Sequence, residues 1–156
     1  MIEVKKCITV SDFSQALQLT RDYLHWIDID LSFQDIDREL VNFSSLYGSP
    51  DGLFLLAVNN GEIAGGVGMR QIESSTCEMK RLFVYDRFKR QGVGRMLCNR
   101  LLQEARNIGY DKMRLDTLGR MTAAIMLYKA LGFEEIGAYR YNPAPEAKYF
   151  EFKLRE

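Results

Sequence analysis

A basic, glycine-containing turn lies near the middle of the chain: Phe88-Lys89-Arg90-Gln91-Gly92-Val93-Gly94-Arg95. It follows an apolar run that ends at Tyr85 and precedes an amphipathic segment, which predicts a strand, a turn and a helix in succession. Glycine lets backbone N–H groups approach a ligand that a Cβ atom would hold away, and a helix start adds unsatisfied donors and a positive dipole end. With the charges of Lys89, Arg90 and Arg95, the turn indicates a site for a phosphate or pyrophosphate.

Other nucleotide-binding loops have a different spacing. A P-loop needs G-x-x-x-x-G-K-[ST] and a dinucleotide fingerprint needs G-x-G-x-x-G, whereas Leu97 stands three residues after Gly94. Taken alone, the turn fits an anion site and an ordinary solvated helix start about equally well. A second segment favours the anion site. It runs from Ala124 to Phe133 and predicts a helix that ends at Gly132 before an aromatic residue.

Together the two segments resemble the GCN5-related N-acetyltransferase (GNAT) superfamily. The family's phosphate loop reads [Q/R]-x-x-G-x-[G/A], and Lys89 to Gly94 match it with Lys89 in place of the usual Gln or Arg. Its last motif reads A-x-x-x-Y-x-x-x-G-F, which Ala124 to Phe133 match. Met121 departs from the family, because many members have there an Asn that contacts the cofactor. The resemblance covers most of the chain, from Leu53 to Leu154.

The resemblance implies one GNAT-like α/β domain over residues 1–156. Its mixed sheet would be mostly antiparallel, with helices on both faces and a central parallel strand pair that splays apart. The βαβ pattern over residues 77–117 independently predicts that parallel pair and a right-handed crossover. In the family, the pantetheine arm of the cofactor enters the splay and bonds the backbone of the earlier strand, which corresponds here to Leu82, Phe83 and Val84.

Hydrophobic periodicity and turn residues predict the other elements. We expect strands over residues 2–10, 53–58, 63–72, 77–85, 112–117, 133–141 and 148–154. We expect helices after an N-cap at Ser11 and over residues 32–44, 93–108 and 122–131. Asn60-Gly61 predicts a hairpin turn, and Gly109 predicts a helix end.

Composition excludes several classes of protein. The chain has 156 residues, 47% apolar and 27% charged, which is typical of one globular domain. Lys plus Arg and Asp plus Glu number 21 each, so we expect neither a nucleic-acid partner nor a membrane partner. Three widely spaced Cys residues and one His predict no metal site and no disulfide framework, and the chain lacks an apolar leader. A reduced, cytoplasmic protein is therefore expected.

Six charged residues fall on strands that we expect near the centre of the sheet: Arg70, Glu78, Lys80, Arg81, Arg114 and Asp116. Charged side chains are rarely buried unless they are paired. The six therefore form either an ion-pair network that fixes strand register or the wall of an acceptor cleft, and the sequence leaves both interpretations open. Four of the six are positive, which would suit an acceptor with a carboxylate. Arg81, Arg70 and Asp116 are the candidate acceptor-binding residues.

Glu78 and Tyr128 are the candidate catalytic residues. Glu78 stands eleven residues before Lys89, matching the general-base glutamate in the histone-acetylating branch of the family. A base matters because an amine attacks a thioester only in its deprotonated form. Tyr128 matches the family tyrosine that protonates the leaving CoA thiolate, and packing on the apolar stripe of its helix is the alternative.

The resemblance implies an acyl-CoA-dependent N-acetyltransferase that acts by direct attack and without a metal. The acetyl group of acetyl-CoA would move to the primary amine of a small molecule, for instance an amino-acid-like one. The implied cofactor-binding residues are Leu82, Phe83, Val84, Lys89, Arg90, Gln91, Gly92, Val93, Gly94 and Arg95. Acetylation of protein N-termini or lysines, and a non-catalytic acyl-CoA-binding module, are the alternatives. A homodimer is left open.

Overall fold

The computed structural model describes residues 1–27 and 35–155. In this part of the chain, one mixed sheet has the strand order β1-β2-β3-β4-β5-β7-β6, and only β4 with β5 is parallel. The strands are β1 (Ile2–Lys6), β2 (Leu53–Asn59), β3 (Glu62–Glu73), β4 (Thr76–Val84), β5 (Lys112–Leu118), β6 (Glu134–Ile136) and β7 (Ala147–Lys153). The helices are α1 (Val10–Ile27), α2 (Ile36–Val41), α3 (Phe43–Leu46), α4 (Val93–Ile108) and α5 (Thr122–Leu131). The predicted fold class is confirmed.

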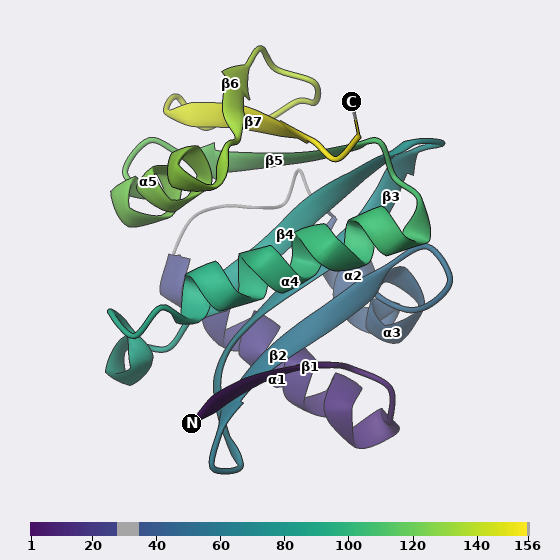
Figure 1. Cartoon of the computed structure of the whole chain (residues 1–156), viewed down its shortest axis with the longest axis vertical. Coiled ribbons are helices and arrows are strands. Elements are labelled where there is room, and N and C mark those ends of the chain that lie inside the picture. Colours follow the sequence, from purple (N-terminus) through teal and green to yellow (C-terminus); the bar gives the residue numbers. More distant parts are fainter. Residues whose placement is uncertain (28–34, 156) are drawn as a thin grey trace.

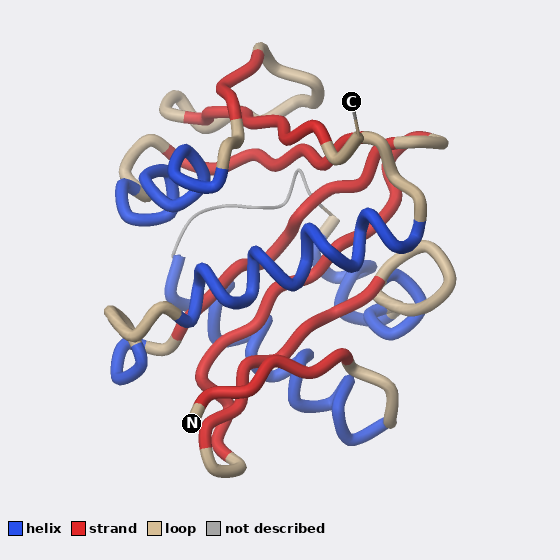
Figure 2. Tube along the Cα trace, viewed as in Figure 1, coloured by secondary structure: helices blue, strands red, loops and turns tan. Residues whose placement is uncertain are grey.

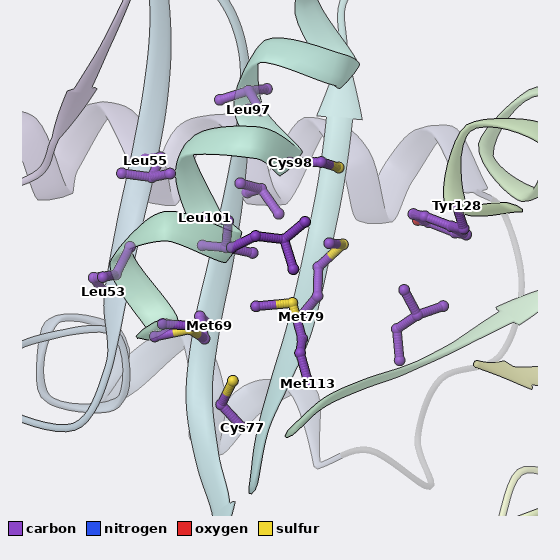
Figure 3. Packing of buried hydrophobic residues seen from close by; sticks show 14 of the residues in the cluster. Leu53, Leu55, Met69, Cys77, Met79, Leu97, Cys98, Leu101, Met113 and Tyr128 are labelled. Carbon is purple, nitrogen blue, oxygen red and sulfur yellow. The ribbon is translucent and has the colours of Figure 1, made fainter. Parts of the chain in front are cut away.

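Helices cover both faces of the sheet (Figures 1 and 2). Helix α4 crosses one face, and α1 packs on the other. Strand β2 shows the consequence, because Leu53, Leu55 and Ala57 pack in the α4-side cluster while Phe54 and Leu56 pack in the α1-side cluster. A strand that is apolar at every position is typical of a sheet buried on both faces. Figure 3 shows the α4-side cluster from close by.

The elements around the glycine signals have the predicted bounds. Helices α4 and α5 begin and end where the sequence predicts, and Gly109 and Gly132 follow them with φ values of 113° and 109°. Glycine adopts such left-handed values without steric strain. The β2–β3 hairpin turns at Asn60-Gly61, where both φ values are positive, at 50° and 82°. This two-residue turn matches the strand twist.

The N-terminal elements differ from the prediction. Strand β1 is shorter than expected, and α1 begins at Val10, before the predicted cap at Ser11. Thr9 occupies the cap position, because its Oγ1 accepts the Asp12 N–H at 3.0 Å and Asp12 Oδ2 accepts the Thr9 N–H at 3.0 Å. This reciprocal pair is a capping box, formed here with Asp in place of Glu.

Two other predicted elements are divided or shortened. The helix expected over residues 32–44 is two short helices, α2 and α3, and residues 32–34 of it lie outside the described residues. The strand expected over residues 133–141 is only β6, which ends at Ile136. Tyr139 and Arg140 in the following segment instead bond to Glu78 of β4, which draws the chain away from the sheet edge.

The parallel strands β4 and β5 pair over a short distance and then diverge (Figure 1). Their ladder has three pairs and ends at Glu78 with Arg114. Beyond this point the backbone of β4 on its β5 side has no strand partner in the part of the chain that the structure describes. The sheet therefore opens between its two central strands, as the family resemblance implies.

A β-bulge lies in β4 at the start of this opening. Three steps along β4, from Lys80 to Phe83, face two steps along β3, and Arg81 within them has a φ of 62°. That value is unusual for a long side chain. The extra residue reverses the alternation, so Met79 packs on the α4 side while Phe83 packs on the α1 side. In a regular strand these two side chains, four residues apart, would share a face.

Candidate active site

A groove of about 680 Å³ opens between the end of β4 and the N-terminal ends of α4 and α5. All the predicted cofactor-binding residues except Gln91 line it. Gln91 instead points its amide at the backbone oxygen of Arg87, 3.4 Å away. Sequence reasoning missed several other lining residues, namely Trp26, Arg120, Thr122 and Ala123. Trp26, the single tryptophan, lies beside the exposed His25.

The N-terminus of α4 gives this groove the features of an anion site. Gly92 precedes the helix with a φ of 78°, and no side chain caps the first turn. A Cβ atom on Gly92 would meet nothing within 4 Å, so the groove is open at this point. The free N–H groups of the first turn and the positive dipole end favour a phosphate group. Lys89, Arg90 and Arg95 add full positive charges along the same groove.

A smaller cavity, of about 70 Å³, lies where β4 and β5 diverge. It adjoins the groove, because Leu82, Met121 and Ala124 line both. Its other walls are Tyr23 and Ile27 of α1, Met79, Lys80 and Arg81 of β4, Leu115 to Leu118 of β5, Tyr128 of α5, and Asn142. We call it the acceptor cavity. The groove therefore lies next to the gap between the two strands.

Tyr128 reaches the acceptor cavity from α5 and is held by other aromatic rings. Its ring lies 5.7 Å from that of Phe133 and 6.1 Å from that of Phe150, and only 5% of the residue is exposed. Figure 3 shows Tyr128 at the α5 side of the buried cluster. Burial raises the pKa of the Tyr128 phenol well above its usual value. The hydroxyl is therefore protonated at neutral pH and can donate a proton to a leaving group.

Glu78 is fully buried and its carboxylate is occupied. Tyr139 donates its hydroxyl to Oε2 at 2.6 Å, and Arg140 Nη1 lies 3.0 Å from both oxygens. Burial acts to raise the pKa of Glu78, but Lys80, Arg140 and the two hydrogen bonds outweigh it and hold the pKa below its usual value. Glu78 also does not line the acceptor cavity. The geometry thus favours the ion-pair interpretation of Glu78 over the base interpretation.

Arg81 lines the acceptor cavity, but its guanidinium is already paired. Nε and Nη2 of Arg81 each donate to an oxygen of Glu39 at 2.9 Å, and both residues are buried. This bidentate pair ties β4 to α2 at the bulge. The guanidinium of Arg81, which we expected to bind the acceptor, is therefore occupied by Glu39. The sequence pattern did not indicate this pair, because the two residues are 42 positions apart.

The other predicted acceptor residues are separated in the structure. Asp116 lines the acceptor cavity and accepts a hydrogen bond from Asn142 Nδ2 at 3.1 Å. Arg70 lies outside that cavity, with Nε 3.9 Å from Glu78 Oε1. Lys80, which we counted among the charges but gave no role, lies inside it. The structure thus brings together Asp116, Arg81 and Tyr128, and it leaves Arg70 apart.

None of the three cysteines is suited to act as a nucleophile. Cys7, Cys77 and Cys98 are free and buried, and burial raises the pKa of each thiol to about 12. None of them is a thiolate at neutral pH, so none is an activated nucleophile. Over residues 1–27 and 35–155, the structure contains no group of acidic, His or Cys side chains suited to a metal ion and no helix able to cross a membrane.

Comparison with known proteins identifies the family. Residues 16–133 match the model described as the acetyltransferase (GNAT) family. The chain belongs to the GNAT family. It is 34% identical over 145 residues to an uncharacterized N-acetyltransferase of Schizosaccharomyces pombe, covering 92% of this chain and 89% of that protein. This GNAT chain is therefore an N-acetyltransferase.

More distant relatives include enzymes named for a product. N-acetylaspartate synthetase of Rattus norvegicus is 33% identical over 112 residues, which cover 70% of this chain and 38% of that protein. Solved structures share the fold at lower identity. A GNAT acetyltransferase from Staphylococcus aureus has a TM-score of 0.80 at 19% identity, covering 99% of this chain and 100% of that one. An N-acetyltransferase from Thermoplasma acidophilum in complex with coenzyme A has a TM-score of 0.73 at 17% identity, covering 98% and 99%.

Proposed function

We propose that this GNAT chain transfers the acetyl group of acetyl-CoA to the primary amine of a small molecule that also carries a carboxylate. The observation that carries the proposal is that the groove adjoins the acceptor cavity. A phosphate-compatible helix start lies in the groove, and a protonated tyrosine lines the cavity beside it.

The groove suits acetyl-CoA in two respects. The amides at Gly92 and Gly94 and the charges of Lys89, Arg90 and Arg95 would hold the pyrophosphate. The backbone of β4 from Leu82 to Val84 lies past the end of its ladder with β5 and would bond the amide groups of the pantetheine arm. The solved relative from Thermoplasma acidophilum, whose fold is shared, contains coenzyme A.

The residues around the acceptor cavity would supply the chemistry of acyl transfer. The amine nitrogen attacks the thioester carbon, and the carbon–sulfur bond breaks as the amide forms. Tyr128 would give its proton to the leaving sulfur. A backbone N–H at Leu82 or Phe83 would donate to the oxygen on which negative charge develops. Asp116 would attract the acceptor ammonium, because a carboxylate that accepts one bond from Asn142 can accept others.

The charges beside the acceptor cavity support an acceptor with a carboxylate. The single carboxylate of Glu78 has two permanent cations within 4.0 Å, Arg70 and Arg140. A second anion would balance this local excess of positive charge. The side chains of Arg70 and Arg140 are 25% and 23% exposed, so neither is sealed off from a ligand, although neither lines the acceptor cavity itself. Relatives named N-acetylaspartate synthetase are consistent with an acceptor of this class.

The acceptor side is closed in a way that favours a small molecule over a protein. The segment between β6 and β7 is bonded to the sheet at two carboxylates, the buried Glu78 and the half-buried Asp116. Arg140 bonds to Glu78, and Asn142 bonds to Asp116. A protein segment would need an open groove across this position. We therefore place acetylation of protein N-termini or lysines second.

An acceptor panel tests the proposal. Alanine is compared with alaninamide, and aspartate and glutamate are compared with their diamides, which lack any carboxylate. A short lysine-containing peptide is included, and both CoA release and the N-acetylated product are measured. The carboxamide has the more readily deprotonated amine, so chemistry alone would favour it. We expect kcat/KM to be at least about tenfold higher for the carboxylate, the size of one good charged contact. Equal or higher values for the carboxamides would overturn the carboxylate requirement, and faster acetylation of the peptide would favour a protein acceptor.

A further inference from the structure

Lys80 places a buried amine at the wall of the acceptor cavity. This amine has no hydrogen-bond partner among the described residues. The residue is 5% exposed and lines the same cavity as Tyr128. Its Nζ lies 3.8 Å from Glu78 Oε1. A buried ammonium without hydrogen bonds is costly, because no solvent or dipole replaces the lost hydration. This position therefore disfavours the charged form of Lys80.

Lys80 also stands at the point where the two central strands separate. The last pair of the β4–β5 ladder is Glu78 with Arg114. Lys80 and Asp116 follow two residues later on their respective strands, and both line the acceptor cavity. Side chains at matching positions of parallel strands share a face, so the amine and the carboxylate stand on opposite sides of the gap. An acceptor ammonium attracted by Asp116 would lie within reach of Lys80.

The surrounding charges act on Lys80 from several elements. Those that face it or its cavity are Glu78 and Arg81 of β4, Arg70 of β3, Glu39 of α2, Asp116 of β5, and Arg140 beyond β6. Burial is the largest influence and lowers the pKa of Lys80 to about 7, with Arg81 and Arg70 acting in the same direction and Glu78 and Glu39 against it. The tyrosines of the cavity, Tyr23 and Tyr128, have raised pKa values and are neutral.

We propose that Lys80 is the base that takes a proton from the ammonium group of the acceptor. The inference rests on the proposed amine acceptor. One N–H proton passes to Lys80 Nζ, and the freed nitrogen forms its bond to the thioester carbon as the bond from carbon to sulfur breaks. Tyr128 gives its proton to the sulfur and regains one from the nitrogen. Lys80 then releases its proton to solvent, so the reaction yields the amide, CoA thiol and one proton.

Glu78 has an indirect part in this arrangement. Its carboxylate is saturated by Tyr139 and Arg140, so it cannot itself reach the acceptor. At 3.8 Å it does attract positive charge to Lys80 Nζ, and it therefore supports the protonated state that follows proton transfer. Glu78 is a positioning residue for Lys80.

Two substitutions at Lys80 distinguish its role as a base from a role as a cation that binds the acceptor carboxylate. Lys80→Met removes both the proton acceptor and the charge, whereas Lys80→Arg keeps a permanent charge and cannot accept a proton. Lys129→Met, at an exposed position on α5, is the matched control. The measured quantity is kcat/KM for the acceptor between pH 6 and pH 10.

The wild type should accept the ammonium form, so its kcat/KM should rise through about pH 7, where Lys80 loses its proton, and then level off. Both Lys80 variants should need an amine that is already deprotonated. For an acceptor whose pKa is about 10, they should be at least about 10²-fold slower at pH 7 and approach the wild type above about pH 9.

Stability gives a second readout that does not depend on activity. The unfolded lysine has a pKa near 10.4 and the folded one about 7, so the unfolded state binds more protons between these values. Wild-type stability should therefore rise with pH across this window relative to Lys80→Met, which should be the more stable protein at pH 7. Parallel stability curves would show that Lys80 stays charged, and they would overturn the inference.

The remaining outcomes are distinct. If Lys80→Arg keeps the wild-type pH profile while Lys80→Met raises only the acceptor KM, Lys80 is a carboxylate-binding cation and the base assignment fails. If both variants keep the wild-type profile, Lys80 has no part in the reaction. If the wild type acetylates no amine, the proposed function fails and the base assignment fails with it.

Discussion

Tyr128→Phe removes the phenolic proton donor and keeps the aromatic ring, which packs in the buried cluster. The rings of Phe133 and Phe150 surround this position, so the substitution should leave the folded structure and acetyl-CoA affinity unchanged. Burial raises the pKa of the Tyr128 phenol, so every wild-type molecule carries the proton at neutral pH. Loss of a general acid costs about 10²-fold to 10⁴-fold in rate. We expect kcat to fall at least about 10²-fold, which corresponds to roughly 2.7 kcal/mol of the barrier.

The assay is CoA release under saturating acetyl-CoA and acceptor, with urea unfolding measured on the same samples. Tyr110→Phe is the matched control, because Tyr110 is also a buried tyrosine but donates its hydroxyl to the backbone oxygen of Asp51, outside the groove and the acceptor cavity. That variant should lose about 1 to 2 kcal/mol of stability and keep its kcat. Wild-type turnover in Tyr128→Phe would assign Tyr128 to packing alone.

Three further predictions concern the groove and the ion pairs. Gly94→Glu should weaken acetyl-CoA binding, measured by calorimetry, at least about tenfold, because the new carboxylate repels phosphate. The fold should tolerate the change, since a Cβ atom at this position meets only Leu127 at 3.3 Å. Unchanged affinity would contradict the assignment of the anion site. Glu39→Gln should cost about 3 kcal/mol by urea unfolding at pH 7, because it leaves a buried guanidinium without its countercharge. Since the pKa of Glu39 is lowered in the folded protein, this loss should shrink as the pH falls below about 4.5, and a constant loss would contradict the pairing. Glu78→Gln should move the acid limb of the rate profile to lower pH, because the carboxylate raises the pKa of Lys80; a shift to higher pH would contradict the arrangement.

Local sequence signals predicted which elements form the groove. Helices α4 and α5 have their predicted bounds because each has a regular apolar stripe and ends at a glycine that needs a positive φ. The groove lies between those two helix starts and the end of the preceding strand β4, so correct element bounds also give its position. Trp26 was missed as a lining residue, because nothing in the sequence near α1 indicates that its end reaches the start of α4.

The acceptor side depends on contacts between residues far apart in the sequence. Glu39 with Arg81 and Arg140 with Glu78 join segments 42 and 62 residues apart, and no spacing rule relates them. The bulge at Arg81 was missed as well, since a positive φ is expected at glycine and not at arginine. The sequence correctly raised the question of why charges lie on central strands. Only the structure separates the charges held by hydrogen bonds from Lys80, whose Nζ makes none with the described residues.

A crystal structure with acetyl-CoA tests the central claim most directly. We predict that the pyrophosphate lies on the amides of Gly92 and Gly94, and that the pantetheine arm follows β4 past Leu82. The acetyl carbonyl should then lie in the gap between β4 and β5, within hydrogen-bonding distance of a β4 backbone N–H and with its sulfur beside Tyr128. A cofactor whose phosphates lie elsewhere, or whose acetyl group points out of this gap, would contradict the account.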